Sequence, residues 1–382
     1  MQILLSAGEA SGETYGAQLI EALRRIRPDA KFFGMGGERM RAAGCELLVD
    51  AREVAVVGLV EVLTHLPHIR NRFRQLVAQA EKRRPNAAVL IDFPEFNLRL
   101  ARQLHRLNIP VFYFVSPQIW AWRTGRVKQI KKYVRKMIVI FPFEQEFYRR
   151  HGVDVTYVGH PLAHAAASSI SRADFAEPSG LHVDRPWIAL LPGSRKKEVK
   201  LNLPEMLAGA RLLKDDPKSK GFEFVIPVAS TLDENWLRQQ LSGEGIDVHL
   251  AHDARAALKH SRAAIVASGT ATVEAALAPV PFVVVYRLAR MTWLLGRRLV
   301  SLDTFAMPNL IAGRRIVQEL IQKDFTAANV ARELDVVIPE GAPRQRMLSD
   351  LAEVREKLLA GGHSEAPAVR AAREILTLLA AN

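Results

Sequence analysis

The first residue that could do chemistry is Asp92, which follows the apolar run AAVLI in the stretch AAVLIDFPEFN. Pro94 cannot continue the hydrogen-bond ladder of a strand, so we expect the strand to end here, with the carboxylate at its carboxyl end. A carboxylate at that edge can act as a general base that takes a proton from an acceptor hydroxyl. An aspartate that starts a turn is equally common after a strand, so this stretch alone leaves both interpretations open.

A second candidate is the stretch LLPGSRKKEVK, in which a strand ends in Pro-Gly-Ser and is followed by Arg195. Small residues such as Ser194 let a backbone approach a phosphate closely, and a guanidinium supplies paired donors to its oxygens. This pattern indicates a phosphate site. A solvated basic turn would have the same composition, because charged loops are usually surface.

A third candidate is SGTATVEAAL, residues 268–277, which predicts a helix that opens with Ser, Gly and Thr. Free backbone N–H groups and the positive end of the helix dipole favour an anion there, and a diphosphate would fit. Ordinary N-capping by Ser or Thr is the alternative. If Thr270 is the cap, Glu274 lies one residue past the capping-box position, so the carboxylate is available to the hydroxyls of a ribose.

Two further segments combine apolar and basic residues. The segment VSPQIWAWRTGRVKQIKKYVRK (115–136) joins two tryptophans to a basic helix but carries no RNA-binding signature, so membrane phosphates are a better partner than nucleic acid. The segment Val54–Val77 is apolar for about a dozen residues and then supplies Arg70, Arg72 and Arg74. It is typical of an interfacial membrane anchor, with an amphipathic core helix as the alternative.

The elements that must position these residues alternate along the whole chain. Short apolar strands separate helical patterns, in the order QILLSA, AAVLID, VFYFVS, MIVIFP, WIALLPG, FEFVIPV, AAIVASG and FVVVY. Continuous apolar strands between helices predict parallel sheets covered on both faces, so the fold class is α/β. We expect doubly wound units over residues 1–165 and 186–325, and a helical segment over residues 326–382.

Composition limits which partners, metal sites and membrane segments the chain can have. The chain has 382 residues, 49% of them hydrophobic, and 53 Lys and Arg against 40 Asp and Glu, which suits an anionic partner. Cys45 is the single cysteine, so an internal disulfide and a cysteine-based zinc cluster are excluded. The 11 histidines form no metal-binding motif, and we expect neither a metal site nor a cofactor. No apolar run reaches the roughly 20 residues of a membrane span, and we expect no signal peptide.

Ten short motifs occur in an order that resembles the lipid-A-disaccharide synthase family. They are AGEASGE, GLVEV, IDFPEFN, VSPQIWAWR, FPFE, VGHP, LLPGSR, ASGTATVEAAL, YR and PNLIAGR. The resemblance runs from residue 4 to about residue 320. The resemblance implies a GT-B fold, with two Rossmann-like domains facing across a cleft. It also implies transfer of 2,3-diacylglucosamine from UDP to the 6'-hydroxyl of 2,3-diacylglucosamine 1-phosphate, known as lipid X.

The same resemblance implies roles for particular residues. Asp92 matches the essential aspartate of the family and would be the base that deprotonates the acceptor hydroxyl. The UDP site would be formed by Ser194, Arg195, Ser268, Gly269, Thr270, Ala271 and Glu274, with Arg287 and Asn309 as further contacts. No metal is then needed for the leaving diphosphate. The substrates imply a cytoplasmic enzyme peripheral to the anionic inner membrane, and a homodimer is open because some members pair through their C-terminal helical region.

The resemblance places the N-terminal loop GEASGET against the acceptor or sugar, with Glu9, Ser11 and Gly12 as the contacts. One departure from the family pattern occurs here. The family usually has Ser-Gly-Asp, whereas this chain has Glu13, whose side chain is one methylene longer. A direct substrate contact would shift with that change, so we expect Glu13 to contribute to the start of the helix instead.

Two other functions remain compatible with the sequence. One is another GT-B enzyme that uses UDP-N-acetylglucosamine, such as the lipid II-forming transferase or a sugar 2-epimerase. Those enzymes should show a different glycine-rich N-terminal turn, and neither calls for VSPQIWAWR. The other is a non-catalytic protein that binds a nucleotide sugar or an anionic lipid, which turnover of substrate would exclude.

Overall fold

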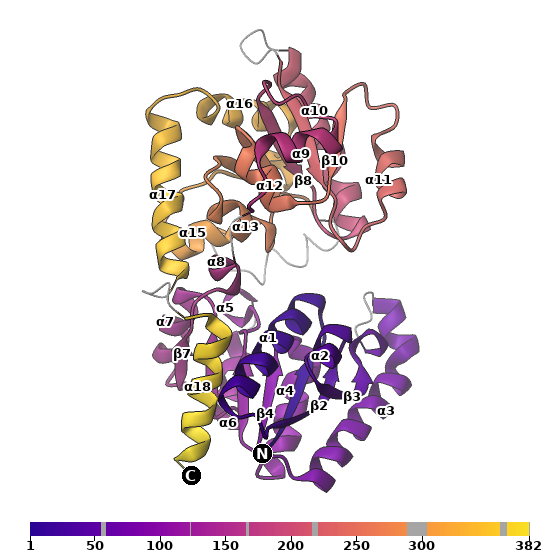
Figure 1. Ribbon diagram of the computed structural model, residues 1–382, viewed down its shortest axis with the longest axis vertical. Helices are drawn as coiled ribbons and strands as arrows, with labels where there is room; N and C mark the ends of the chain where they lie inside the picture. The colour runs from indigo at the N-terminus through magenta and orange to yellow at the C-terminus, as the bar shows by residue number, and fades with distance from the viewer. Residues whose placement is uncertain are drawn as a thin grey trace. The chain divides into compact units, whose positions relative to one another are not determined.

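The computed structural model describes residues 1–54, 59–122, 124–165, 168–215, 221–288, 304–359 and 365–381. The chain divides into two compact units (Figure 1). The first unit contains Met1–His164 and Leu358–Asn382, and the second contains Ala165–Lys357.

The first unit is built on a seven-stranded sheet in the order β3-β2-β1-β4-β5-β6-β7. Every adjacent pair of strands is parallel. Its strands are β1 (Gln2–Ala7), β2 (Lys31–Gly36), β3 (Cys45–Asp50), β4 (Ala87–Ile91), β5 (Val111–Phe114), β6 (Lys136–Val139) and β7 (Val155–Tyr157). Its helices are α1 (Ala10–Ile26), α2 (Glu38–Ala42), η1 (Ala51–Glu53), α3 (Leu59–Arg83), α4 (Pro94–Arg106), α5 (Ile119–Trp122), η2 (Thr124–Arg126), α6 (Val127–Tyr133), α7 (Pro142–Arg150), α8 (Pro161–His164) and α18 (Pro367–Ala380).

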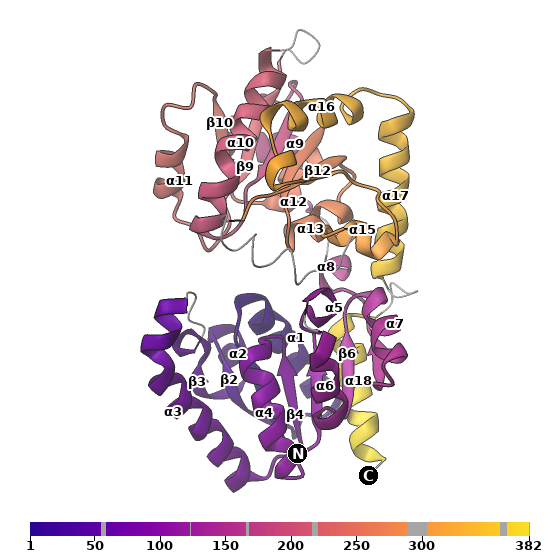
Figure 2. The same cartoon turned by 180° about the vertical axis from the view of Figure 1, so that it is seen from behind.

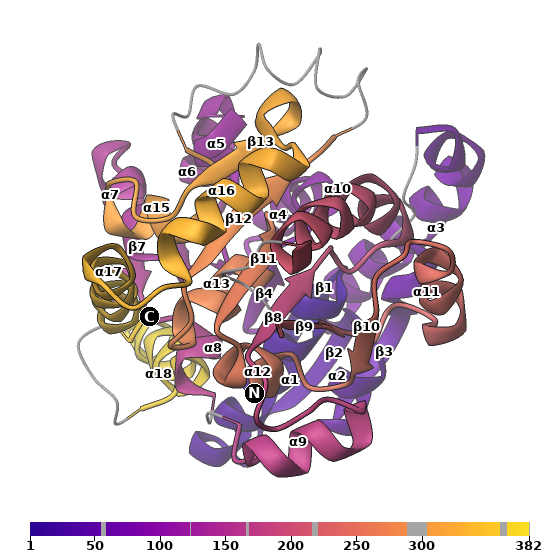
Figure 3. The ribbon, with the colours of Figure 1, turned by 90° about the horizontal axis from the view of Figure 1, so that it is seen from above.

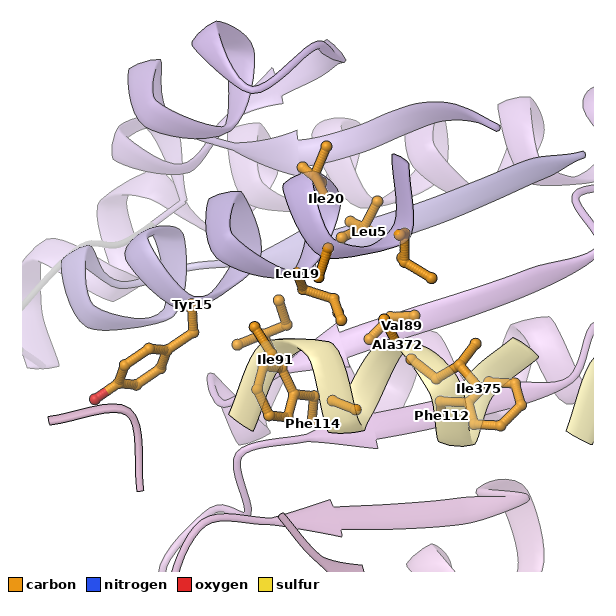
Figure 4. Packing of buried hydrophobic residues seen from close by; sticks show 14 of the residues in the cluster. Leu5, Tyr15, Leu19, Ile20, Val89, Ile91, Phe112, Phe114, Ala372 and Ile375 are labelled. Carbon is orange, nitrogen blue, oxygen red and sulfur yellow. The ribbon is translucent and has the colours of Figure 1, made fainter. Parts of the chain in front are cut away.

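Side chains on these strands alternate between two buried cores, one on each face of the sheet. On one face Leu5, Val89 and Phe112 pack with residues of α1 and α18 (Figure 4). On the other face Leu4 and Leu90 pack with residues of α3, α4 and α6, and α4 and α6 lie side by side there (Figure 2). Because both faces are covered, the strands are apolar throughout, which is the pattern that predicted a parallel sheet.

The C-terminal helix α18 belongs to the core of the first unit. Ala372 and Ile375 are fully buried and lie in the same cluster as Leu5 and Val89. Glu374 of this helix forms an ion pair with Lys136 at 3.1 Å and accepts a hydrogen bond from Thr156 at 3.0 Å. Helix α18 therefore covers part of one face of a sheet whose first strand begins at residue 2.

The second unit has a six-stranded parallel sheet in the order β10-β9-β8-β11-β12-β13. Its strands are β8 (Trp187–Leu191), β9 (Glu223–Pro227), β10 (Val248–Ala251), β11 (Ala263–Ala267), β12 (Phe282–Tyr286) and β13 (Glu319–Ile321). Its helices are α9 (Arg172–Ser179), α10 (Lys196–Asp215), α11 (Glu234–Leu241), α12 (Ala254–His260), α13 (Ala271–Leu277), α15 (Met307–Ala312), η4 (Gln322–Asp324), α16 (Ala327–Val337) and α17 (Ala342–Leu358). Helices α10 and α16 pack together (Figure 3) over a core that contains Ile188, Leu203 and Leu334.

The structure confirms the α/β class and all eight predicted strands, and it adds five more: β2, β3, β7, β10 and β13. The predicted helical segment over residues 326–382 contains helices and no strand in its described part. Those helices are divided between the units, because α16 and α17 lie in the second unit and α18 lies in the first.

Both sheets follow the doubly wound order in which the chain first builds outward on one side of its first strand and then on the other. The reversal lies between β1 and β4 in the first unit and between β8 and β11 in the second. Ligands of such sheets bind outside the carboxyl ends of the strands at this point. The loops that follow these four strands contain Gly8–Gly12, Asp92, Ser194–Arg195 and Ser268–Ala271, so each unit brings two predicted loops together.

Candidate functional site

In the first unit the loops after β1 and β4 are in close contact. A β-carbon built on Gly8 would lie 2.3 Å from the ring of Phe93, so only glycine leaves room for that ring. Behind them, the fully buried Asn97 accepts a hydrogen bond from Ser6 Oγ at 2.6 Å, and its Nδ2 lies 3.2 Å from Ser6 O and 3.1 Å from Ile91 O. Asn97 of α4 thus joins the ends of β1 and β4.

Asp92 lies on a strained turn at this point. Asp92 has a φ of 45° and Phe93 a φ of 50°, both in the left-handed region that favours glycine. Such residues cost about 1–3 kcal/mol each and persist only when surrounding contacts hold them. The carbonyl oxygen of Asp92 accepts hydrogen bonds from Tyr113 Oη at 2.6 Å and from Asn97 Nδ2 at 2.8 Å.

The Asp92 carboxyl is partly buried and has an unusual acidity. Burial, and then the negative charge of Glu9, raise its pKa to about 7, against an opposing hydrogen bond from the Phe93 backbone. Titratable groups also interact with it from β5 (Tyr113) and from α7 (Glu144). A carboxyl with a pKa near neutrality is well matched to proton transfer at physiological pH.

The other predicted residues of the N-terminal loop surround the start of α1. Glu9 is the exposed N-cap residue of α1, and its side chain makes no capping hydrogen bond. Ser11 is also exposed, whereas Gly12 is buried, and a β-carbon there would meet Ile91 and Ala7 only at ordinary contact distances of 3.6 and 3.7 Å. Glu9 and Ser11 therefore present polar side chains to solvent, and the charge of Glu9 acts on the Asp92 carboxyl.

Glu13 lies in the first turn of α1, but its carboxylate serves a different helix. Its Oε1 accepts a hydrogen bond from Arg39 N at 2.6 Å, which is a backbone donor in the first turn of α2. A β-carbon at Gly37 would lie 2.5 Å from that carboxyl. The longer side chain of Glu13 therefore caps α2, and this contact accounts for the residue without a substrate.

The loops VSPQIWAW and FPFE are connected by a buried carboxyl. Glu144 accepts hydrogen bonds from Trp120 Nε1 and from Phe141 N, both at 3.2 Å. It is 1% exposed, and burial raises its pKa to about 8. Glu144 therefore fixes the loop after β5, which lies beside the strand that carries Asp92, to the start of α7.

In the second unit the loop after β8 carries the predicted phosphate ligands. Gly193 has a φ of 123°, so this turn requires glycine. Arg195 is exposed and pairs with Glu198 at 3.2 Å, and Glu198 also accepts a hydrogen bond from Ser194 N at 3.2 Å. The donors predicted to bind a diphosphate are thus held here by a carboxylate in the first turn of the following helix, α10.

The loop after β11 lies next to it at the switch point. Gly269 and Thr270 are exposed, and within the described residues no acceptor binds the backbone N–H groups of Gly269, Thr270 and Ala271. Thr270 is the N-cap residue of α13, but its side chain makes no capping hydrogen bond. The alternative of side-chain N-capping by Thr270 is therefore wrong. Ser268 is partly buried at the end of β11 and donates its backbone N–H to Val285 O at 2.9 Å.

Glu274 is half-buried in α13, and burial raises the pKa of its carboxyl, with Arg255 opposing the shift and Asp253 adding to it. Its environment fits a carboxyl that accepts hydrogen bonds from a neutral group such as a ribose hydroxyl.

Arg287 is engaged by its own unit. Its guanidinium pairs with Glu205 of α10 at 3.1 Å, donates to Phe325 O and lies 4.9 Å from the centre of the Phe325 ring. Its backbone N–H donates to Asn202 Oδ1 at 3.0 Å, and Asn202 Nδ2 donates to Pro192 O at 3.1 Å. This cluster connects the end of β12 to Pro192, which follows β8. Arg287 therefore supports the start of the loop that contains Ser194 and Arg195.

Asn309 lies on α15, and its side chain is fully hydrogen-bonded to the segment that follows this helix. It is 1% exposed, its Nδ2 donates to Val317 O and Glu319 Oε1, and its Oδ1 accepts from Ile316 N and Val317 N. A primary amide can make four hydrogen bonds, and all four are used. No polar atom of this side chain is left for UDP in the present structure.

The sequence did not predict the residues that hold these loops in place. Asn97, Tyr113, Glu144 and Asn202 are buried polar side chains that bridge elements distant in the chain. A buried polar side chain needs hydrogen-bond partners. A polar residue on the apolar face of a predicted helix, such as Asn97 in PEFNLRLARQL, was therefore the sequence signal that could have indicated a bridging role. Cys45 is buried, and burial raises the pKa of its thiol to about 12.

The predicted interfacial segment is only partly described. Residues 55–58 lie outside the described part, as do the side chains of residues 59–65. In the remainder, Ile69, Phe73 and Leu76 pack in the core of the first unit, so this half of α3 is an amphipathic core helix. Arg70 and Arg74 are exposed, and Arg72 pairs with Glu53 at 2.6 Å. No helix in the described residues combines the length and apolar character needed to cross a bilayer.

Solved structures with the same architecture define the class of fold. The crystal structure of the calicheamicin glycosyltransferase CalG4 has a TM-score of 0.60 at 17% identity, covering 99% of this chain and 98% of that one. The UDP-GlcNAc 2-epimerase from Neisseria meningitidis, bound to UDP-GlcNAc, has a TM-score of 0.60 at 14% identity and covers both chains completely. At these identities the likeness shows the fold alone. The chain has the GT-B fold, with two parallel doubly wound sheets and a helical C-terminal segment.

Sequence comparison places the chain more narrowly. The family model for lipid-A-disaccharide synthetase matches residues 3–371. The lipid-A-disaccharide synthase of Koribacter versatilis is 52% identical over 381 residues, which cover 99% of this chain and 98% of that protein. The enzyme of the same name from Myxococcus xanthus is 46% identical over 379 residues, with 99% and 97% covered. The chain belongs to the lipid-A-disaccharide synthetase family, and it is therefore a glycosyltransferase of lipid A biosynthesis.

Proposed function

We propose that the protein transfers 2,3-diacylglucosamine from UDP to the 6'-hydroxyl of 2,3-diacylglucosamine 1-phosphate (lipid X). The products are UDP and a β-1,6-linked disaccharide 1-phosphate. Family membership supports the reaction class. The observation that carries the proposal for this chain is the Asp92 carboxyl, which lies on a strained turn at the switch point and has a pKa of about 7.

The proposed step is a single displacement with inversion at the anomeric carbon. Asp92 takes the proton of the 6'-hydroxyl while that oxygen forms its bond to the anomeric carbon. The bond from this carbon to the β-phosphate oxygen of UDP breaks, and its electron pair leaves with UDP. We assign the acceptor side to the first unit, with Glu9, Ser11 and Gly12 next to Asp92.

We assign UDP to the second unit. Arg195 and Ser194 would bind the diphosphate from the loop after β8. The backbone N–H groups of residues 269–271 and the hydroxyl of Ser268 would bind it from the loop after β11. Glu274 would accept hydrogen bonds from the ribose. Arg287 and Asn309 would act through the loops they hold, since their side chains are engaged by Glu205 and Glu319.

The test is UDP release from UDP-2,3-diacylglucosamine in the presence of lipid X. We expect release by the wild type and a loss of at least about a hundredfold in Asp92→Asn, because a removed general base costs 10² to 10⁴. Absence of UDP release by the wild type would contradict the function. An active Asp92→Asn variant would instead contradict the role of Asp92.

We further propose that the reaction needs no metal, because Arg195 and the backbone donors supply the charge that a metal would supply. Addition of EDTA should then leave the rate of UDP release unchanged. A loss that Mg²⁺ restores would show that the leaving diphosphate requires a cation.

We also propose peripheral association with the anionic inner membrane. The support is a set of exposed basic side chains on the adjacent helices α4 and α6, namely Arg99, Arg102, Arg106, Lys128, Lys131 and Lys132. Co-sedimentation with vesicles should require anionic lipid and should weaken as salt rises. Equal binding to neutral vesicles would contradict an electrostatic attachment.

A further inference from the structure

We propose that Tyr113 and Asn97 are positioning residues that hold the Asp92 peptide in its left-handed conformation and thereby fix the direction of the carboxyl. This inference rests on the proposed function, in which Asp92 is the base. In this part of the chain the family resemblance gave a role to Asp92 only. Asn97 ends the same motif, IDFPEFN, without a role assigned to it, and Tyr113 lies outside the ten motifs.

The turn at Asp92 has a conformation that its own residues disfavour. Asp92 and Phe93 are consecutive left-handed residues without being glycine. Pro94 follows, and a proline normally drives the residue before it to an extended conformation. Since local preferences oppose this geometry, contacts from other elements must maintain it.

Those contacts converge on one atom, the carbonyl oxygen of Asp92. Tyr113 Oη donates to it at 2.6 Å from β5, and Asn97 Nδ2 donates at 2.8 Å from α4. The two lone pairs of this oxygen are thereby used. Tyr113 and Asn97 are both fully buried, so water cannot replace either donor at low cost.

Fixing the carbonyl constrains the carboxyl, because the carbonyl carbon and the β-carbon that carries the carboxyl are attached to the same α-carbon. The direction of the carbonyl sets ψ of Asp92, and the backbone angles set the direction in which the β-carbon leaves the chain. Asn97 is in turn held by Ser6 Oγ at 2.6 Å, so the turn is tied to β1 as well as to β5. A side chain placed 1 Å away from its reacting geometry can lose about a hundredfold in rate.

The alternative is that Tyr113 simply fills the core, where its ring packs with Leu90 and Met137. Tyr113→Phe separates the two roles, since it keeps the ring and removes only the hydroxyl. Tyr148→Phe is the matched control. Tyr148 is equally buried, and its hydroxyl hydrogen-bonds to Ser116 Oγ at 2.8 Å instead of to Asp92.

The experiment measures UDP release against pH for the wild type and both variants, with unfolding in urea as the measure of stability. We expect Tyr113→Phe to lower kcat about tenfold or more and to leave KM for the nucleotide sugar within about twofold. We expect Tyr148→Phe to lose stability to a similar extent and to keep kcat within about twofold.

The pH profile gives a second readout. A relaxed turn would expose the carboxyl to water, and solvation favours its charged form, so the acidic limb of kcat/KM should move to lower pH in Tyr113→Phe. The other groups that interact with this site, Glu9 of α1, Glu144 of α7 and Arg126 of η2, are unchanged in that variant. The limb should not move in Tyr148→Phe.

Equal kcat values and equal acidic limbs in the two variants would overturn the inference. Asp92→Asn separates this failure from failure of the proposed function. If Asp92→Asn is inactive while Tyr113→Phe behaves like the control, Asp92 is the base and the positioning role is wrong. If Asp92→Asn is fully active, the base assignment itself is wrong.

Asn97→Ala extends the test where the variant folds. It removes the second donor to Asp92 O but also leaves Ser6 Oγ without its acceptor, so we expect a larger loss of stability than in Tyr113→Phe. Circular dichroism shows whether Asn97→Ala is folded, and only then are its kinetics interpreted. The kinetics of Tyr113→Phe test the inference whether or not Asn97→Ala folds.

Discussion

Gly8 and Phe93 approach so closely that a β-carbon on Gly8 would lie 2.3 Å from the aromatic ring. The ring belongs to the residue directly after Asp92, and it also stacks on Phe96 at 5.8 Å. The glycine after β1 thus determines where the turn after β4 can lie. This contact explains in physical terms why a glycine begins the loop GEASGET.

We therefore expect Gly8→Ala to displace Phe93 and with it the Asp92 turn. UDP release should fall by about tenfold or more, because a small shift of the base is costly. Gly125→Ala is the control, since a β-carbon there would have no atom of the described residues within 4 Å beyond its chain neighbours. If Gly8→Ala is folded and releases UDP at the normal rate, the displacement of the Asp92 turn does not affect the reaction.

Much of this arrangement could be predicted because its signals are local. Eight strands were predicted from apolar runs, and the loops that contain Asp92, Arg195 and Ser268 follow directly from them. The missed strands have weaker patterns for identifiable reasons. Four of them, β3, β7, β10 and β13, lie at sheet edges, where one neighbour is missing and strands are less buried. The fifth, β2, contains two glycines in KFFGMG.

The residues that hold the site could not be predicted in the same way. Tyr113 donates to a carbonyl that lies 21 residues earlier in the chain, and Arg287 pairs with a carboxylate that lies 82 residues earlier. No local pattern encodes such partners. The same holds for α18, whose amphipathic sequence predicts a helix but does not indicate which sheet it covers.

The raised pKa of Asp92 predicts a trade-off between activity and stability. The carboxyl has a pKa of about 7 in the folded protein against a usual value of 3.8. The folded state therefore binds this proton more tightly than the unfolded state, and the carboxyl costs the fold increasing free energy as pH rises from 3.8 to about 7. Asp92→Asn should consequently gain stability relative to the wild type across that window, by roughly 1–4 kcal/mol at its upper end.

Urea unfolding at several pH values measures this gain. Asp50→Asn is a control of opposite sign, because a hydrogen bond from Arg52 lowers the pKa of Asp50, so its removal should destabilise the fold near neutral pH. A difference between Asp92→Asn and the wild type that does not change with pH would mean that Asp92 does not titrate with the raised pKa.

Glu198 should compete with UDP. Its carboxylate accepts from Ser194 N and pairs with Arg195, both at 3.2 Å, and these are the donors assigned to the diphosphate. We expect Glu198→Gln to bind UDP about three- to tenfold more tightly and Arg195→Ala to bind it at least about tenfold more weakly, as measured by calorimetry. The comparable pair of Arg238 and Glu234 on α11 provides the control, and Arg238→Ala should leave UDP affinity unchanged. Weaker binding by Glu198→Gln would mean that the carboxylate organises the loop for UDP.

Asn309 should matter for stability before it matters for UDP. Its four hydrogen bonds connect the start of α15 to Glu319 and to the backbone of Ile316 and Val317. We expect Asn309→Ala to lose roughly 2–4 kcal/mol of unfolding free energy, because several buried polar groups lose their partner at once. The folded fraction should bind UDP within about threefold of the wild type. A large loss of UDP affinity without a loss of stability would mean that Asn309 contacts UDP directly.

The C-terminal helix α18 should stabilise the first unit selectively, although the whole second unit lies between this helix and the other elements of the first unit in the sequence. Ile375 of α18 is fully buried in the cluster that contains Leu5, Val89 and Phe112. Ile375→Ala should cost about 2–5 kcal/mol, since it removes buried methyl groups and leaves a cavity. Because the units are separately compact, that loss should lower hydrogen-exchange protection in β1, β4 and β5 and leave β8 and β11 unchanged. Leu334→Ala, which opens the core of the second unit, should give the reverse pattern. Equal loss of protection in both sheets from either substitution would mean that the two units unfold as one cooperative body.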